Sequence, residues 1–212
     1  HELFHSLCLD FSGIKYESLR SKIKKIFDVQ SDFEISESYS EFWALILNSC
    51  FVSFKLLDRP DDIDNYLLFA EFCIQLERIF SLFQMIKILH FMGLRYENLF
   101  RTDTLSVSFR KILYKEDTNV LAYFIIKTIL LFYNDDFLKW CLINNNNILK
   151  FDKIPQNLNK FYDFIKEKYN TTFFTTSIEK MDLFFKSRRG EFYHKNVKGV
   201  VLTTTRMSIC EN

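Results

Sequence analysis

Glycine and proline are scarce in this chain. Only 4 Gly and 2 Pro occur among 212 residues, whereas average usage would give about 25. Tight turns and phosphate-binding loops depend on these two residues, so the scarcity disfavours all-β sandwiches and enzymes built on glycine-rich loops. An apolar fraction of 48%, with 25 Phe, also excludes a disordered chain. We therefore expect a mainly α-helical globular protein.

Apolar residues recur at three- and four-residue spacing along most of the chain, which is typical of helices. The spacing predicts longer helices over residues 16–29, 41–54 and 65–92, the last ended by Gly93. Shorter helices are expected over 95–113, 119–132 and 135–143, followed by a first wing strand over 148–151, an order typical of a winged helix. Two more helices (155–169 and 177–186) and a small terminal β-hairpin (191–205) complete the expected elements.

These elements predict a helical stack followed by a winged-helix subdomain. Residues 1–94 would form the stack, residues 95–152 the winged-helix-like subdomain, and residues 153–212 a basic C-terminal extension packed on it. No stretch of 18 apolar residues lacks a charge and no signal peptide opens the chain, so we expect no membrane span. Five widely spaced cysteines are typical of reduced packing residues, which favours a nuclear or cytosolic compartment.

Charge is divided unevenly between the two parts of the chain. Residues 1–94 carry 9 Lys/Arg against 14 Asp/Glu, and residues 95–212 carry 19 against 13. Such a basic half suits a polyanionic partner, and a solvated surface is the competing interpretation. We predict that RNA binds there, with a tyrosine ring available for stacking. The predicted RNA-binding residues are Arg110, Lys111, Lys115, Lys186, Arg188, Arg189, Tyr193, Lys195 and Lys198.

The first five residues match a zinc motif. His1-Glu2-Leu3-Phe4-His5 is an H-E-x-x-H pattern, which places two imidazoles on one helical face, with the glutamate as general base. A third ligand would have to come from His90, His194 or a carboxylate, and none stands in a recognisable following motif. We therefore interpret the segment as a helix start whose Leu3, Phe4 and Leu7 face the core, and we predict no metal, no cofactor and no catalytic residue.

Five segments carry a family resemblance. They are Leu19–Val29, which ends in Ile-Phe-Asp-Val, Glu41-Phe-Trp-Ala-Leu-Ile-Leu47, Asn65-Tyr-Leu-Leu-Phe69, Leu94-Arg-Tyr-Glu-Asn-Leu99, and Ile129–Cys141, with Leu-Leu-Phe before a helix ending Lys-Trp-Cys. In this order they resemble the Sac-three/GANP family, the PCI-domain scaffold of the TREX-two mRNA-export complex. The chain departs from the family pattern at three positions: Trp43, Leu45 and Ala70.

The resemblance implies a non-enzymatic scaffold in the nucleus, at nuclear pores. It implies a second PCI-domain subunit and a small acidic Sem/DSS-type protein as partners, together with RNA. Two alternatives stay open. A PCI subunit of the proteasome lid, the COP9 signalosome or a translation-initiation assembly would have the same plan without RNA binding, and would be cytoplasmic in some of these assemblies. From another class, a zinc hydrolase would use His1, Glu2 and His5.

Overall fold

The computed structural model describes residues 1–14, 16–116, 118–193 and 205–210, with only the helical backbone described for residues 189–193. The expectation of a mainly α protein is confirmed, and no strand occurs in these ranges beyond an isolated bridge between Asn147 and Lys150. The elements are α1 (Glu2–Ser6), α2 (Glu17–Ile26), α3 (Ser36–Lys55), α4 (Ile63–Phe91), η1 (Tyr96–Leu99), α5 (Thr104–Leu113), η2 (Leu121–Ile126), α6 (Lys127–Phe132), α7 (Asn134–Asn144), α8 (Pro155–Lys168) and α9 (Thr172–Tyr193).

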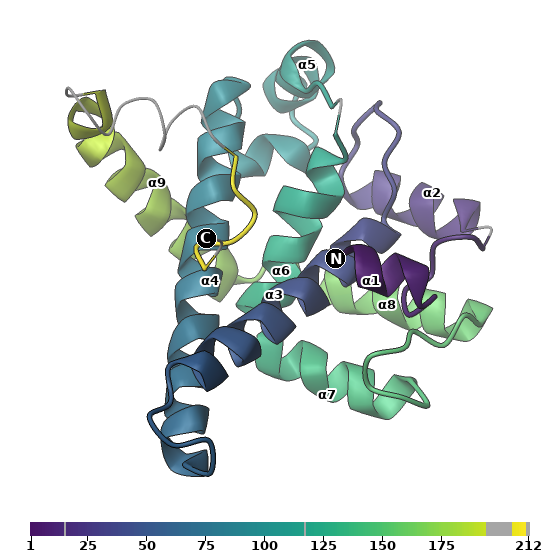
Figure 1. Ribbon diagram of the computed structural model, residues 1–212. Coiled ribbons are helices and arrows are strands. Elements are labelled where there is room, and N and C mark those ends of the chain that lie inside the picture. The colour runs from purple at the N-terminus through teal and green to yellow at the C-terminus, as the bar shows by residue number, and fades with distance from the viewer. Residues whose placement is uncertain (15, 117, 194–204, 211–212) are drawn as a thin grey trace.

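Two long helices, α3 and α4, form the centre of the molecule. Figure 1 shows them meeting at the bottom of the view, with α9 beside α4. Both helices also pack against η2 and α6. Because α4 has neighbours on several sides, its apolar residues are spread around the helix rather than along one stripe, and Met85 and Leu89 are fully buried.

The ends of α4 follow the local signals in the sequence. At the start, Asp62 Oδ1 accepts a hydrogen bond of 3.1 Å from the Asn65 amide. At the end, Gly93 has a φ of +72°, and the Leu94 amide donates to the Leu89 carbonyl at 2.8 Å. A left-handed residue after the last turn closes a helix in this way, and glycine adopts that conformation most easily.

Several predicted elements differ from the structure. The helix expected over 95–113 is divided into η1 and α5, because the Asp103 carboxylate accepts from the Ser106 amide at 3.0 Å and starts a new helix. The expected wing strand at 148–151 is a loop, held where the Phe151 amide donates to the Leu9 carbonyl at 2.7 Å. The winged helix is thus not confirmed. Of the expected hairpin, Glu191–Tyr193 belong to α9, and residues 194–204 lie outside the described residues.

One large core draws on all three expected parts of the chain. Its centre is aromatic: Phe11 and Phe151 have ring centroids 4.5 Å apart, Phe42 and Phe137 4.8 Å, and Phe11 and Phe161 5.6 Å. Edge and tilted contacts of this kind stabilise aromatic cores beyond simple burial. Among the described helices, none combines the length and the apolar character needed to cross a membrane.

Candidate metal centre

The short helix α1 is held in place by one buried side chain and a sharp turn. Phe4 is 4% exposed, and its carbonyl accepts a hydrogen bond from the Leu9 amide at 2.9 Å. Cys8, with a φ of +53°, turns the chain back after the helix. The sequence-based interpretation was wrong for Leu3 and Leu7, which are 71% and 62% exposed. The side of this segment that meets the protein carries Phe4, His5 and the N-cap residue His1.

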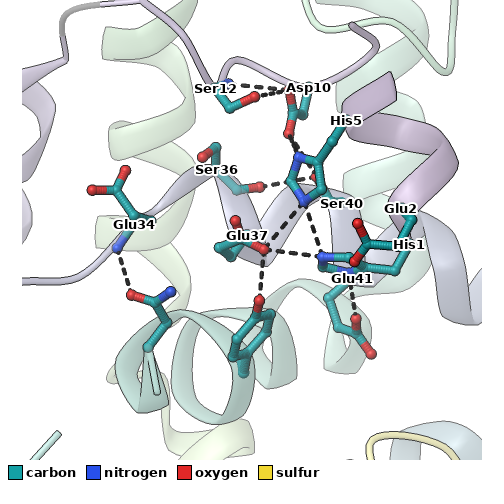
Figure 2. A network of polar contacts seen from close by, with 12 residues as sticks. His1, Glu2, His5, Asp10, Ser12, Glu34, Ser36, Glu37, Ser40 and Glu41 are labelled. Atoms are coloured by element: carbon teal, nitrogen blue, oxygen red, sulfur yellow. Dashed lines mark hydrogen bonds and ion pairs between the residues drawn. The ribbon is translucent and has the colours of Figure 1, made fainter. Parts of the chain in front are cut away.

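The first turns of α3 supply acidic residues to the same place. Glu37, Ser40 and Glu41 lie three and four residues apart, so they share one face of the helix. Figure 2 shows this face opposite His1 and His5, with Glu2 beside His1. Ser40 is fully buried and Glu41 is 6% exposed. Two helices far apart in the sequence therefore meet through polar side chains.

Three ligand-type atoms form a small triangle at this contact. His1 Nε2 lies 3.0 Å from His5 Nε2 and 3.0 Å from Glu37 Oε2, and His5 Nε2 lies 3.3 Å from Glu37 Oε2. A tetrahedral ion with bonds of 2.0–2.1 Å separates its ligands by about 3.3 Å. Within the described residues, His1, His5 and Glu37 are the group of His, Cys, Asp and Glu side chains whose ligand atoms lie close enough together to hold a metal ion. The triangle fits three ligands of such an ion.

Each imidazole is also bonded on its other nitrogen to a carboxylate. His1 Nδ1 lies 2.8 Å from Glu41 Oε2, and His5 Nδ1 lies 2.5 Å from Asp10 Oδ2. A carboxylate at Nδ1 holds a proton there and directs Nε2 at the triangle. Nε2 of His1 donates to Glu37, so a metal ion bound at this nitrogen would displace its proton. Metal-binding histidines are usually oriented by such partners.

Asp10 is a built part of this arrangement. The residue is fully buried. Its Oδ1 accepts from the Ser12 amide at 3.1 Å and from the Ser12 hydroxyl at 2.7 Å, and its Oδ2 accepts from the Ser40 hydroxyl at 3.0 Å. A buried carboxylate with this many donors is fixed in position, so the His5 ring that it bonds is fixed too.

The third ligand-type residue, Glu37, is positioned from η2. The Tyr123 hydroxyl donates to Glu37 Oε2 at 2.7 Å. Tyr123 lies on η2, which is a π-helical turn, and turns of this type are frequent at functional sites. Three separate elements, α1, α3 and η2, therefore converge on one carboxylate oxygen.

The electrostatics of the cluster favour a positive charge at its centre. Hydrogen bonds to Glu37 and Glu41 raise the pKa of His1 to about 10. Burial acts to raise the pKa of Glu37, but hydrogen bonds from His1 and Tyr123 outweigh it and hold that pKa below its usual value. Burial and the hydrogen bond to Glu37 raise the pKa of Tyr123, with Glu41 and Glu2 adding to the effect. The surrounding carboxylates thus stabilise a cation between them. Without a metal ion that cation is the protonated His1 ring, and a bound metal ion would replace its Nε2 proton.

The cluster is partly open to solvent. The side chains of His1, His5 and Glu37 are 22%, 25% and 16% exposed. Three protein ligands with an open side are typical of catalytic zinc sites, whereas structural sites are closed by four ligands.

The sequence pattern identified two of the three ligand-type residues, His1 and His5, but not Glu37. The prediction of no metal rested in part on the lack of a third ligand, and in the structure Glu37 lies beside the two histidines. His90, considered for the role, instead lies 2.5 Å from Asp182 on α9, and His194 is outside the described residues. The available signal was Glu37-Ser-Tyr-Ser-Glu41, two carboxylates one turn apart at a helix start.

The described residues among the predicted RNA-binding set lie on and just after α5 and on α9, and one of them is buried. Arg110 is 4% exposed and donates to the Asp28 carboxylate at 3.0 Å and to the carbonyls of Asn98, Arg101 and Asp28. It is therefore a packing residue, closed to a phosphate. Figure 1 shows α5 and α9 on either side of the upper end of α4. The exposed basic residues are Lys111 on α5, Lys115 after it, and Lys186 and Arg188 on α9; the side chains of Arg189, Tyr193, Lys195 and Lys198 are outside the described part.

Comparisons of this chain with protein-family models, with curated proteins and with solved structures found no match.

Proposed function

We propose that the protein is a metal-dependent hydrolase that binds one zinc ion through His1, His5 and Glu37 and cleaves amide bonds. The observation that carries the proposal is the triangle of donor atoms, with edges of 3.0, 3.0 and 3.3 Å. Two imidazoles and a carboxylate are a donor set that suits zinc. The H-E-x-x-H pattern adds a glutamate next to the first ligand, where a general base is needed.

The chemistry divides between the ion and the chain. A zinc ion in this site would polarise a carbonyl group and lower the pKa of a water molecule. Glu2 would accept a proton from such a water while the water oxygen bonds to the carbonyl carbon of the amide. Glu2 would then return that proton to the amide nitrogen as the C–N bond breaks, which gives a carboxylic acid and an amine. The acid passes its remaining proton to the amine or to solvent and leaves as a carboxylate. Glu41, Asp10 and Tyr123 act as positioning residues, because they contact the ligands rather than the reacting atoms.

The proposal is tested by separating zinc binding from hydrolysis. We expect elemental analysis of the purified protein to find one zinc per chain, lost in His5→Ala and in Glu37→Ala. Glu2→Gln should keep its zinc and lose cleavage of a quenched fluorescent peptide library by at least about 100-fold.

Glu34→Gln is the matched control. Glu34 lies just before α3 and bonds to Arg20 at 2.8 Å rather than to the cluster, so this variant should keep both zinc and activity. Wild-type protein without zinc after incubation with excess zinc, or zinc retained in both His5→Ala and Glu37→Ala, would contradict the metal centre. Zinc binding without any peptide cleavage would contradict the hydrolase and leave the metal centre standing.

A scaffold function is the second candidate, and exposed apolar surface favours it. Phe51, Ile63, Phe72 and Phe91 are 65%, 69%, 61% and 92% exposed, and surfaces of this kind mark protein contacts. The proposal of a nuclear PCI-type scaffold with a second PCI subunit, a Sem/DSS-type protein and RNA rests on the sequence resemblance alone. Co-purification from cell extract followed by mass identification of bound subunits tests it.

A further inference from the structure

The junction of α3 and α4 carries an apolar groove on the outside of the molecule. On α3, Leu47, Cys50, Phe51 and Phe54 recur at three- and four-residue spacing, and on α4 the groove is completed by Ile63 and Tyr66. Its volume is about 600 Å³. We call this feature the hairpin groove.

Several of the apolar side chains that line the hairpin groove are exposed to solvent. Phe51, Phe54 and Ile63 are 65%, 52% and 69% exposed. Over the same stretch α3 buries mainly small polar side chains, Ser49 and Ser53. Leu47, at one end of the stripe, also packs against the core, whereas Phe51 and Phe54 are exposed to solvent. A hydrophobic groove on a protein surface can accept the apolar face of an amphipathic helix.

The end of the groove is acidic. Asp58, Asp61 and Asp64 are exposed around the turn that joins the two helices. The neighbouring basic residues are Lys55 and Arg59, and Arg59 lies 3.8 Å from Asp62. This sign of charge attracts Lys and Arg and repels an anionic lipid surface.

We propose that the hairpin groove binds an amphipathic helix of a partner protein, with an apolar face flanked by Lys or Arg. The apolar stripe supplies the contact area, and the acidic turn selects the charge of the partner and its direction in the groove. This binding site is separate from the metal centre, which lies at the first turns of α3.

The test uses two labelled model peptides of equal length, one built from Leu and Lys and one from Leu and Glu with the same apolar face. Fluorescence anisotropy should show binding of the Leu/Lys peptide, at least tenfold tighter than of the Leu/Glu peptide and weaker at high salt. Phe51→Ser with Ile63→Ser should reduce that binding at least tenfold. Both residues are exposed, so the variant should fold and keep the zinc content of the wild type.

A matched variant, Leu142→Ser with Ile143→Ser, changes two side chains on α7 that are 63% and 80% exposed, and it should bind as the wild type does. Equal affinity for the two peptides, or a groove variant that binds like the α7 variant, would overturn the proposal. A concentration-dependent dimer in sedimentation, abolished by the groove variant, would assign the groove to a second copy and overturn it as well.

Discussion

At the scale of single residues, the best-defined feature is Asp10, because every bond of this buried carboxylate is made inside the protein. It receives the Ser12 amide, the hydroxyls of Ser12 and Ser40, and Nδ1 of His5. The role of Asp10 is therefore to hold His5, and in the proposed zinc site a change at Asp10 should act through His5.

Asp10→Asn should weaken zinc binding by about 10- to 100-fold, because the amide is a poorer acceptor for the Nδ1 proton of His5. The dissociation constant, measured by competition with a chelating dye well below the unfolding temperature, checks this. Ser12→Ala removes one donor to Asp10 and leaves the His5 contact, so its effect should be smaller. If both variants bind zinc equally well, Asp10 does not position the ligand.

Arg110 and Lys111 are neighbours on α5 with opposite environments. Arg110→Leu leaves the carbonyls that it bonds without a donor, so we expect the free energy of unfolding to fall by about 2–3 kcal/mol. Lys111→Leu changes an exposed side chain and should stay within about 0.5 kcal/mol of the wild type. Urea unfolding measures both. Equal effects would mean that the buried hydrogen bonds of Arg110 add nothing to stability.

The same pair of residues shows what sequence could predict here. Arg110 and Lys111 are adjacent and both basic. Which of the two is buried depends on which face of α5 packs against Asp28. Likewise His1 and His5 are recognisable because they stand on one helix, whereas Glu37 joins them through the packing of α1 on α3. The spacing of residues within one helix can be read from a short stretch of sequence, whereas contacts between helices depend on how the whole core packs.

At the scale of elements, the helices expected from periodicity were found where the local signals are strong. Gly93 ends α4 as expected, and the Asp62 cap starts the helix two residues before the predicted residue 65, because a capping carboxylate and a left-handed glycine act within a few residues. The prediction of a strand over residues 148–151 was wrong. Phe151 is buried against the N-terminal segment from within a loop, so its burial does not require strand pairing.

Gly93→Ala should lower the free energy of unfolding by about 1 kcal/mol. The added methyl group would meet the Leu113 side chain at an ordinary 3.6 Å, so the cost comes from the φ of +72° rather than from a clash. Gly93→Asn should cost less, since Asn adopts this conformation more readily. Thermal unfolding of the two variants gives the comparison, and an Asn variant no more stable than the Ala variant would contradict this account.

At the scale of the whole molecule, the cluster joins α1, α3 and η2, which are distant in sequence. An ion held there binds the folded chain far better than the unfolded one, where only the two histidines stay near each other. Zinc at 100 times its dissociation constant should therefore stabilise the fold by about 2.7 kcal/mol.

For a chain of this length, that stabilisation corresponds to a rise of about 5–10 °C in unfolding temperature. Differential scanning calorimetry with zinc and with a chelator measures the difference. In Glu37→Ala the two curves should coincide; a shift of the wild-type size in that variant would mean that zinc binds elsewhere.

The π-helical form of η2 changes the direction in which the side chains that follow it point. A π turn contains one residue more than an α turn, and one residue corresponds to about 100° of rotation around a helix. The extra residue lets Tyr123 face the cluster while Ile129 and Leu130 of α6, further along the same rod, remain fully buried in the core. In an uninterrupted α-helix, either Tyr123 would face the cluster or Ile129 and Leu130 would face the core, but not both.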